Sequence, residues 1–124
     1  MAYGMLKTGI DLIEIGRLEK VIVRHGEKFL NRIFTPLELK ECGGAISSLA
    51  VRFAAKEAVA KALGTGIGHV SWREIEIQRK ETGEPQLKLY GEAEKLALGL
   101  NLNTWSISLS HTRTIAIAQV IAIT

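Results

Sequence analysis

Hydrophobic and polar positions follow two different periods along the chain, and the local period predicts which segments are strands and which are helices. The clearest alternation runs over residues 105–110, where every second position is a serine. Five segments combine such alternation or branched residues with flanking turn residues, and we expect strands at 8–15, 74–79, 86–90, 105–110 and 115–123. Four others have helical spacing with capping or stop residues, and we expect helices at 17–25, 36–42, 48–63 and 92–98.

The order of these segments favours an α+β fold in which a mostly antiparallel sheet packs against one long helix and several shorter helices. No repeat, low-complexity tract or linker divides the sequence, so residues 1–124 are expected to form a single domain. Hydrophobic residues make up 47% of the chain. The last strand is apolar on both faces apart from Gln119, which indicates that another subunit covers part of its surface.

The predicted long helix carries one carboxylate in surroundings that are otherwise uncharged. Its apolar stripe consists of small and branched residues at helical spacing, namely Val51, Ala55, Ala58 and Ala62. Glu57 lies away from this stripe, and only Lys61, four residues later, offers it a charge. An ordinary surface pair between Glu57 and Lys61 explains the pattern. A functional carboxylate beside the glycine-rich segment that follows explains it equally well.

Asp11 is a second unusual carboxylate, because aspartate is depleted in strands and this one lies in an isoleucine-rich strand. By alternation Asp11 shares a face with apolar residues such as Ile13, where an unpaired charge is costly. A salt bridge to a buried cation, with Arg52 as one candidate, would satisfy it. Two such carboxylates in one small domain, without a histidine or cysteine cluster, instead suit Mg²⁺, which takes one or two protein carboxylates and completes its shell with water and phosphates.

A run of glycines follows the long helix, with Gly64, Gly66 and Gly68 separated by single residues. Helix termination alone explains Gly64, but the whole run also suits a close approach of the backbone to a ligand. The order of elements excludes a P-loop, and no dinucleotide-binding fingerprint is present. Phosphates would therefore be bound by side chains such as Lys61 and His111, although a lone histidine at a strand end is more often structural or exposed.

Charge and composition limit the possible partners. The net charge is +3, and Arg17, Lys20 and Arg24 fall on one helical face, which is either a solvated surface or a docking surface for an acidic partner. The single cysteine, Cys42, excludes an intrachain disulfide. No segment has the length of a membrane span, the pattern of a signal peptide or the interleaved aromatic and basic residues of a nucleic-acid platform. We expect a cytoplasmic protein that binds neither membrane nor nucleic acid.

Several motifs together resemble the bacterial holo-[acyl-carrier-protein] synthase family of 4′-phosphopantetheinyl transferases. Gly-Ile-Asp-Leu-Ile-Glu-Ile at 9–15 matches the first motif, and Arg-Phe-Ala-Ala-Lys-Glu-Ala at 52–58 begins the second, which continues to Gly68. Three shorter segments follow in the family's order, at 75–77, 83–85 and 107–112. The resemblance covers nearly the whole chain, and the joint match is specific although no single motif is.

This resemblance implies transfer of 4′-phosphopantetheine from coenzyme A to a serine of an apo acyl carrier protein in fatty acid biosynthesis, with release of adenosine 3′,5′-bisphosphate. It implies that Asp11 and Glu57 hold Mg²⁺ on the pyrophosphate of coenzyme A and act in catalysis together with Lys61. Either Glu57 or a metal-bound water would be the base. The residues expected to contact or border coenzyme A are Arg52, Lys61, Gly64, Gly66, Pro85 and His111.

The resemblance also implies partners and an assembly. The carrier protein is acidic, which gives the face formed by Arg17, Lys20 and Arg24 a partner. Members of the family are commonly trimers with sites between subunits, so we expect a homotrimer. The alternative function is a non-catalytic protein that binds coenzyme A or the carrier protein, and the presence of both Asp11 and Glu57 argues against it. A small basic nucleic-acid-binding protein is a more distant alternative.

Overall fold

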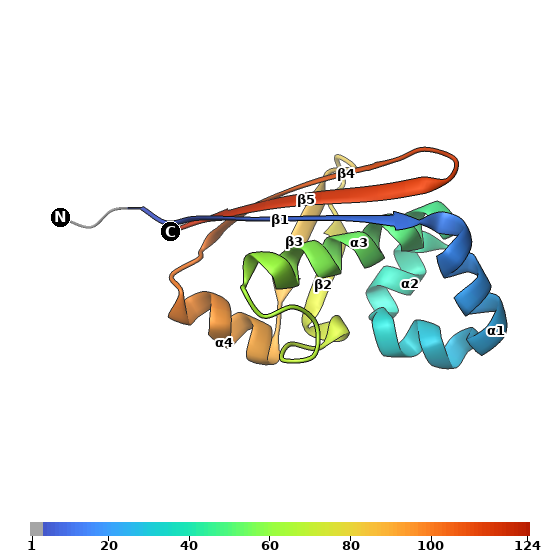
Figure 1. Cartoon of the computed structure of the whole chain (residues 1–124), viewed down its shortest axis with the longest axis horizontal. Helices are drawn as coiled ribbons and strands as arrows, with labels where there is room; N and C mark the ends of the chain where they lie inside the picture. The colour runs from blue at the N-terminus through green and yellow to red at the C-terminus, as the bar shows by residue number, and fades with distance from the viewer. Residues whose placement is uncertain (1–3) are drawn as a thin grey trace.

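The computed structural model describes residues 4–124, and it has the α+β architecture expected from the sequence (Figure 1). All the predicted helices and strands are present. In chain order the elements are β1 (Leu6–Glu14), α1 (Ile15–Ile33), α2 (Pro36–Cys42), α3 (Ile46–Ala62), the short 3₁₀ helix η1 (Trp72–Glu74), β2 (Ile75–Arg79), β3 (Pro85–Leu89), α4 (Gly91–Gly99), β4 (Thr104–His111) and β5 (Ile115–Ile123). Within residues 4–124, every helix is too short or too polar to span a lipid bilayer.

The strands form two antiparallel sheets instead of one. One has three strands in the order β1-β5-β4, and the other is the β2–β3 hairpin. Figure 1 shows the hairpin running across the direction of the three long strands, with α3 lying along one face of the larger sheet. In this sheet Asp11 of β1 is paired with Ala118 of β5. This pairing fixes which face of β1 meets α3.

Helix α3 is enclosed by protein on nearly every side. The predicted stripe of Val51, Ala55, Ala58 and Ala62 is buried, but so are most residues outside it. The reason is that α3 packs against β1 and β5 on one side and against β2, α1 and α2 elsewhere. The many alanines of α3 allow this close approach, because a small side chain lets neighbouring backbones come near.

Two glycines and one capping motif shape the helices before α3. The predicted stop at Gly26 is a kink, because Gly26 has φ 63° and ψ −145° while the chain resumes helical turns up to Ile33. The predicted start of α2 is confirmed, since Thr35 Oγ1 accepts from the backbone N–H of Glu38, whose carboxylate accepts from that of Thr35. Gly43 ends α2 in the left-handed conformation.

The face of the larger sheet that points away from α3 is largely apolar over β1 and β5 and is uncovered, while β4 contributes exposed serines to it. On β5 the inward residues Ala116, Ala118, Val120 and Ala122 are buried, as alternation predicts. The outward side chains of β1 and β5 remain between 38% and 63% exposed at Leu6, Ile10, Leu12, Ile121 and Ile123. One protomer therefore buries only one face of this sheet, which leaves an apolar patch of the kind that marks an interaction surface.

Candidate functional site

Asp11, the only aspartate of the chain, lies on the face of β1 that packs against α3. Its Oδ1 atom accepts a hydrogen bond from Lys61 Nζ at 3.1 Å, and the same ammonium donates to the carbonyl oxygen of Ile10 at 2.9 Å. The Oδ2 atom is buried without a hydrogen-bond partner. A buried carboxylate oxygen without a partner carries a desolvation cost that a bound group would remove.

Glu57 of α3 lies close enough to Asp11 for the charges of the two carboxylates to interact. Burial raises the pKa of the Glu57 carboxyl above its usual value, the negative charge of Asp11 raises it further, and the ammonium of Lys61 partly opposes both. The salt bridge suggested for Asp11 is present, but the suggested partner Arg52 and the suggested ion pair of Glu57 with Lys61 are both wrong. Asp11 pairs with Lys61 and not with Arg52, and among the described residues no ion pair joins Lys61 to Glu57.

The residues present fit a divalent cation bound by oxygen atoms. Asp11 Oδ2 is available, and the pKa of the Glu57 carboxyl, raised by burial and by the negative charge of Asp11, marks a repulsion that a shared cation would relieve. Within residues 4–124, no third histidine, cysteine, aspartate or glutamate completes a cluster with them. A site with two protein carboxylates suits Mg²⁺, because this ion keeps water and phosphate oxygens in its remaining positions.

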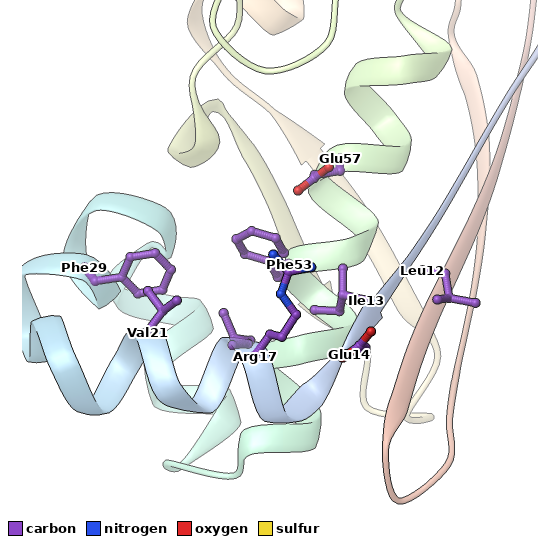
Figure 2. A pocket seen from close by; sticks show the side chains of 9 residues that line it. Leu12, Ile13, Glu14, Arg17, Val21, Phe29, Phe53 and Glu57 are labelled. Atoms are coloured by element: carbon purple, nitrogen blue, oxygen red, sulfur yellow. The ribbon is translucent and has the colours of Figure 1, made fainter.

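A groove with a volume of about 410 Å³ opens beside Glu57. Figure 2 shows Phe53 and Glu57 on α3 facing the side chains of α1, with Arg17 extending from α1 into the same space. The lining is mostly apolar and consists of Leu12, Ile13, Glu14, Arg17, Leu18, Val21, Phe29, Phe53 and Glu57. Arg17, Lys20 and Arg24 are all exposed on α1. Their basic face therefore borders a hollow that reaches one of the two carboxylates.

Phe29 and Phe53 line the groove, although neither was predicted as a site residue. The available signal was the spacing of Phe53 and Glu57, which are four residues apart and so lie on one side of a helix. The contribution of Phe29 could not be seen, because it depends on how α1 packs beyond the kink at Gly26.

The glycine segment follows α3 at the same end as Lys61. Gly64 and Gly66 have φ angles of 86° and 70°, and the N–H of Gly66 donates to the carbonyl oxygen of Ala60 at 3.1 Å. The helix-terminating interpretation of Gly64 is therefore correct.

The other predicted contacts to coenzyme A lie apart from the carboxylates. Arg52 is buried, and its guanidinium donates to the carbonyl oxygen of Ile77 at 3.0 Å and to Glu41 Oε1 at 3.0 Å. Arg52 and Pro85 line a separate small cavity of about 180 Å³. His111 is exposed at the end of β4, which is separated from β1 by the whole of β5. Within one chain the predicted site residues thus lie in three places: Asp11, Glu57 and Lys61 with Gly64 and Gly66 just beyond them, Arg52 and Pro85 at their own cavity, and His111 at the end of β4.

Comparisons with known proteins agree on one family. A family model of the 4′-phosphopantetheinyl transferase superfamily matches residues 7–119. Two relatives are called holo-[acyl-carrier-protein] synthase. The one from Herpetosiphon aurantiacus is 48% identical over 94% of this chain and 98% of its own length. The one from Dehalococcoides mccartyi is 50% identical over 95% of this chain and 98% of its own length.

Solved structures give the same result. The structure of Helicobacter pylori holo-[acyl-carrier-protein] synthase in complex with coenzyme A has a TM-score of 0.85 at 37% identity, covering 93% of this chain and 98% of its own. That of a holo-(acyl-carrier-protein) synthase from Bacillus anthracis in complex with CoA (3′,5′-ADP) has a TM-score of 0.80 at 35% identity, covering 98% and 99%. The chain belongs to the 4′-phosphopantetheinyl transferase superfamily.

Proposed function

We propose that this chain is a holo-[acyl-carrier-protein] synthase. It transfers 4′-phosphopantetheine from coenzyme A to a serine of an apo acyl carrier protein, serves fatty acid biosynthesis, and releases adenosine 3′,5′-bisphosphate. The relatives named holo-[acyl-carrier-protein] synthase and the coenzyme A complexes of similar structures support this activity. The observation that carries the proposal within this chain is the buried, unpartnered Oδ2 of Asp11 beside Glu57 and Lys61.

The chemistry follows from these three side chains. Asp11 and Glu57 would hold Mg²⁺, which when bound neutralises charge on the phosphates of coenzyme A. Lys61 is held at Asp11 by a salt bridge but its side chain is 53% exposed, so its ammonium can also reach a phosphate oxygen. Glu57 lies in the groove wall, where its carboxylate can accept the proton of an incoming serine hydroxyl.

We further propose that the complete site forms between copies of the chain in a homotrimer. Two observations support this assembly. Arg52, Pro85 and His111 lie away from Asp11 in one protomer, so a second copy is needed if they are to contact the same coenzyme A. The outward face of β1 and β5 also exposes apolar side chains that a partner subunit would cover.

The groove beside Glu57 is the proposed docking place of the carrier protein. Its apolar lining would take apolar side chains near the modified serine, and Arg17, Lys20 and Arg24 would attract the acidic surface. This placement brings the serine hydroxyl to the carboxylate that would accept its proton.

We propose a cytoplasmic location and a single domain over residues 1–124, and the lone free thiol of Cys42 supports the location.

Intact-protein mass spectrometry tests the proposed function. Apo acyl carrier protein is incubated with the purified chain, coenzyme A and MgCl₂, and the expected result is a mass gain of one phosphopantetheine. The Asp11→Ala variant serves as the matched negative control, and omission of MgCl₂ tests the metal requirement. Absence of any mass gain with the wild-type chain would instead favour the non-catalytic binding protein.

A further inference from the structure

Lys56 is a fully buried cation whose role the proposed chemistry does not include. Its side chain has 0% exposed area, and Nζ donates to Glu38 Oε1 at 2.7 Å, to the carbonyl oxygen of Trp72 at 3.1 Å and to that of Ile75 at 2.5 Å. An ammonium has three hydrogens, so these three acceptors use all of its donors. Lys56 therefore connects α3 to α2, to η1 and to the start of β2.

Glu38, the carboxylate that accepts from Lys56, is also fixed by further hydrogen bonds. Glu38 is also 0% exposed, and its carboxylate accepts from the backbone N–H of Thr35 at 2.9 Å and from that of Ile77 at 2.8 Å. A buried ion pair with every hydrogen bond made has one favourable geometry, and removing one partner leaves an uncompensated buried charge. The position of the Lys56 ammonium is therefore fixed from outside α3.

The bond from Lys56 to the Trp72 carbonyl bears on the groove beside Glu57. The Trp72 ring stacks on Phe53 with ring centroids 4.7 Å apart and 28° between the planes. Phe53 and Glu57 both line the groove, where Figure 2 shows them on the same side of α3. Trp72 therefore packs on Phe53 without lining the groove itself, and Lys56 holds the backbone of Trp72.

We propose that Lys56 is a positioning residue for carrier binding, because it fixes the Trp72 backbone so that the Trp72 ring holds Phe53 in the groove wall. The proposal rests on the proposed function, in which this groove receives the carrier protein. It separates Lys56 from its sequence neighbour Glu57. Glu57 lines the groove, whereas Lys56 is absent from its lining and its ammonium is fully bonded inside the protein.

Steady-state kinetics of Lys56→Met test the proposal, with Lys95→Met as the matched control at an exposed lysine of α4. We expect the KM for the carrier protein to rise about tenfold, the KM for coenzyme A to change by less than about twofold, and the control to match wild type. A lysine with a merely structural role would lower the active fraction instead. Vmax would then fall equally for both substrates with both KM values unchanged, and that result would overturn the proposal.

Fluorescence gives a second readout that does not need turnover. The chain has two tryptophans, so in a Trp105→Phe background only Trp72 emits. Lys56→Met in this background should shift the emission to longer wavelength and increase quenching by acrylamide, because Trp72 loses its fixed place on Phe53. Unchanged emission and quenching in a folded variant would overturn the proposal.

If Lys56→Met fails to fold, a second variant still tests the proposal. Glu38→Gln with Lys56→Met removes both charges and leaves no unpaired buried ion, and we expect it to show the same selective rise in the carrier KM. If neither variant folds, Lys56 serves the core as a whole and the proposal is wrong. A wild-type chain without transfer activity would be a different failure, because it would overturn the proposed function first and this inference with it.

Discussion

Gly9 of β1 passes so close to Ala58 of α3 that a Cβ atom on Gly9 would collide with the Ala58 carbonyl oxygen. This contact brings the strand down onto the helix two residues before Asp11 and one residue after Glu57. The two candidate metal ligands therefore lie on the two elements that this contact brings together, and only glycine permits the contact. The geometry of the site therefore depends on Gly9 having no Cβ atom.

Gly9→Ala should be strongly destabilising, because the new methyl group meets backbone atoms that cannot rotate away. We expect the free energy of unfolding to fall by about 3 kcal/mol or more, the upper end of overpacking effects. Urea denaturation followed by circular dichroism measures the change. Gly99→Ala is the control, since nothing lies within 4 Å of a Cβ there and its φ is not positive. A Gly9→Ala variant as stable as this control would contradict the contact.

Mg²⁺ should stabilise the wild-type fold, and Asp11→Asn should remove this effect. A ligand at a hundred times its Kd adds about 2.7 kcal/mol to the free energy of unfolding. Thermal unfolding with increasing MgCl₂ measures it, and no turnover is needed. Glu92→Gln, which changes an exposed carboxylate of α4, is the matched control and should respond like wild type. An Mg²⁺ response retained in Asp11→Asn would remove Asp11 from the ligand set.

Ile10→Glu should dissociate the proposed homotrimer. Ile10 is 55% exposed on the outward face of β1, and a charge there would be buried without a partner in an apolar interface. Light scattering should give a trimer mass for wild type and a monomer mass for the variant, with turnover lost if sites form between copies. Leu98→Glu, at a 66% exposed position of α4, is expected to leave the assembly intact. A wild-type chain that is monomeric and fully active would refute the assembly.

Arg17→Glu combined with Arg24→Glu should weaken use of the carrier protein while leaving coenzyme A largely unaffected. Exposed charge pairs contribute only about 0.2–1 kcal/mol each and act mainly on the association rate. One reversal should therefore raise the carrier KM severalfold, and two should raise it further. Added salt should narrow the difference from wild type. The check is steady-state kinetics at two ionic strengths, and an equal loss toward both substrates would mean that the carrier docks elsewhere.

Acid should destabilise the fold partly through Glu76. Burial alone would raise the pKa of this carboxyl, but hydrogen bonds from Thr35 and two further side chains bring it below its ordinary value of 4.5. A lowered pKa in the folded state gives a stabilising contribution that is present above pH 4.5 and is lost as the pH falls through the folded value. Glu76→Gln should be less stable at pH 7 and should lose less stability on acidification. Urea unfolding at several pH values measures both, with the exposed Glu84→Gln as the control.

Local periodicity was sufficient to predict the strands and α-helices of this fold, although not η1 or the part of α1 beyond Gly26. The alternation around Ser106 and Ser108 and the capping sequence at Thr35 each act within a few residues, and both predicted structures are present. The division into two sheets was not predicted. It depends on which strand edges form hydrogen bonds across the molecule, and no local pattern determines that pairing.

The candidate site was likewise predictable where it depends on local sequence and unpredictable where it depends on tertiary packing. Asp11 and Glu57 could be selected because each carboxylate lies among apolar neighbours in the sequence, which is a local property. The ion-pair partner of Lys61 could not be predicted, because the choice between Glu57 on its own helix and Asp11 on β1 depends on tertiary packing. The Phe53–Trp72 stack joins residues far apart in the chain and left no signal in the sequence.

The enclosure of α3 also restricts how the protein can evolve. Of residues 46–62, only Lys61 is exposed. The helix has no outward face on which neutral substitutions could accumulate. Its sides hold the groove wall with the candidate metal ligand Glu57, the contact with Gly9 and the buried ion pair of Lys56. Adaptation to a new carrier protein or a new temperature would therefore have to change α1, α4 and the loops, while α3 stays nearly constant.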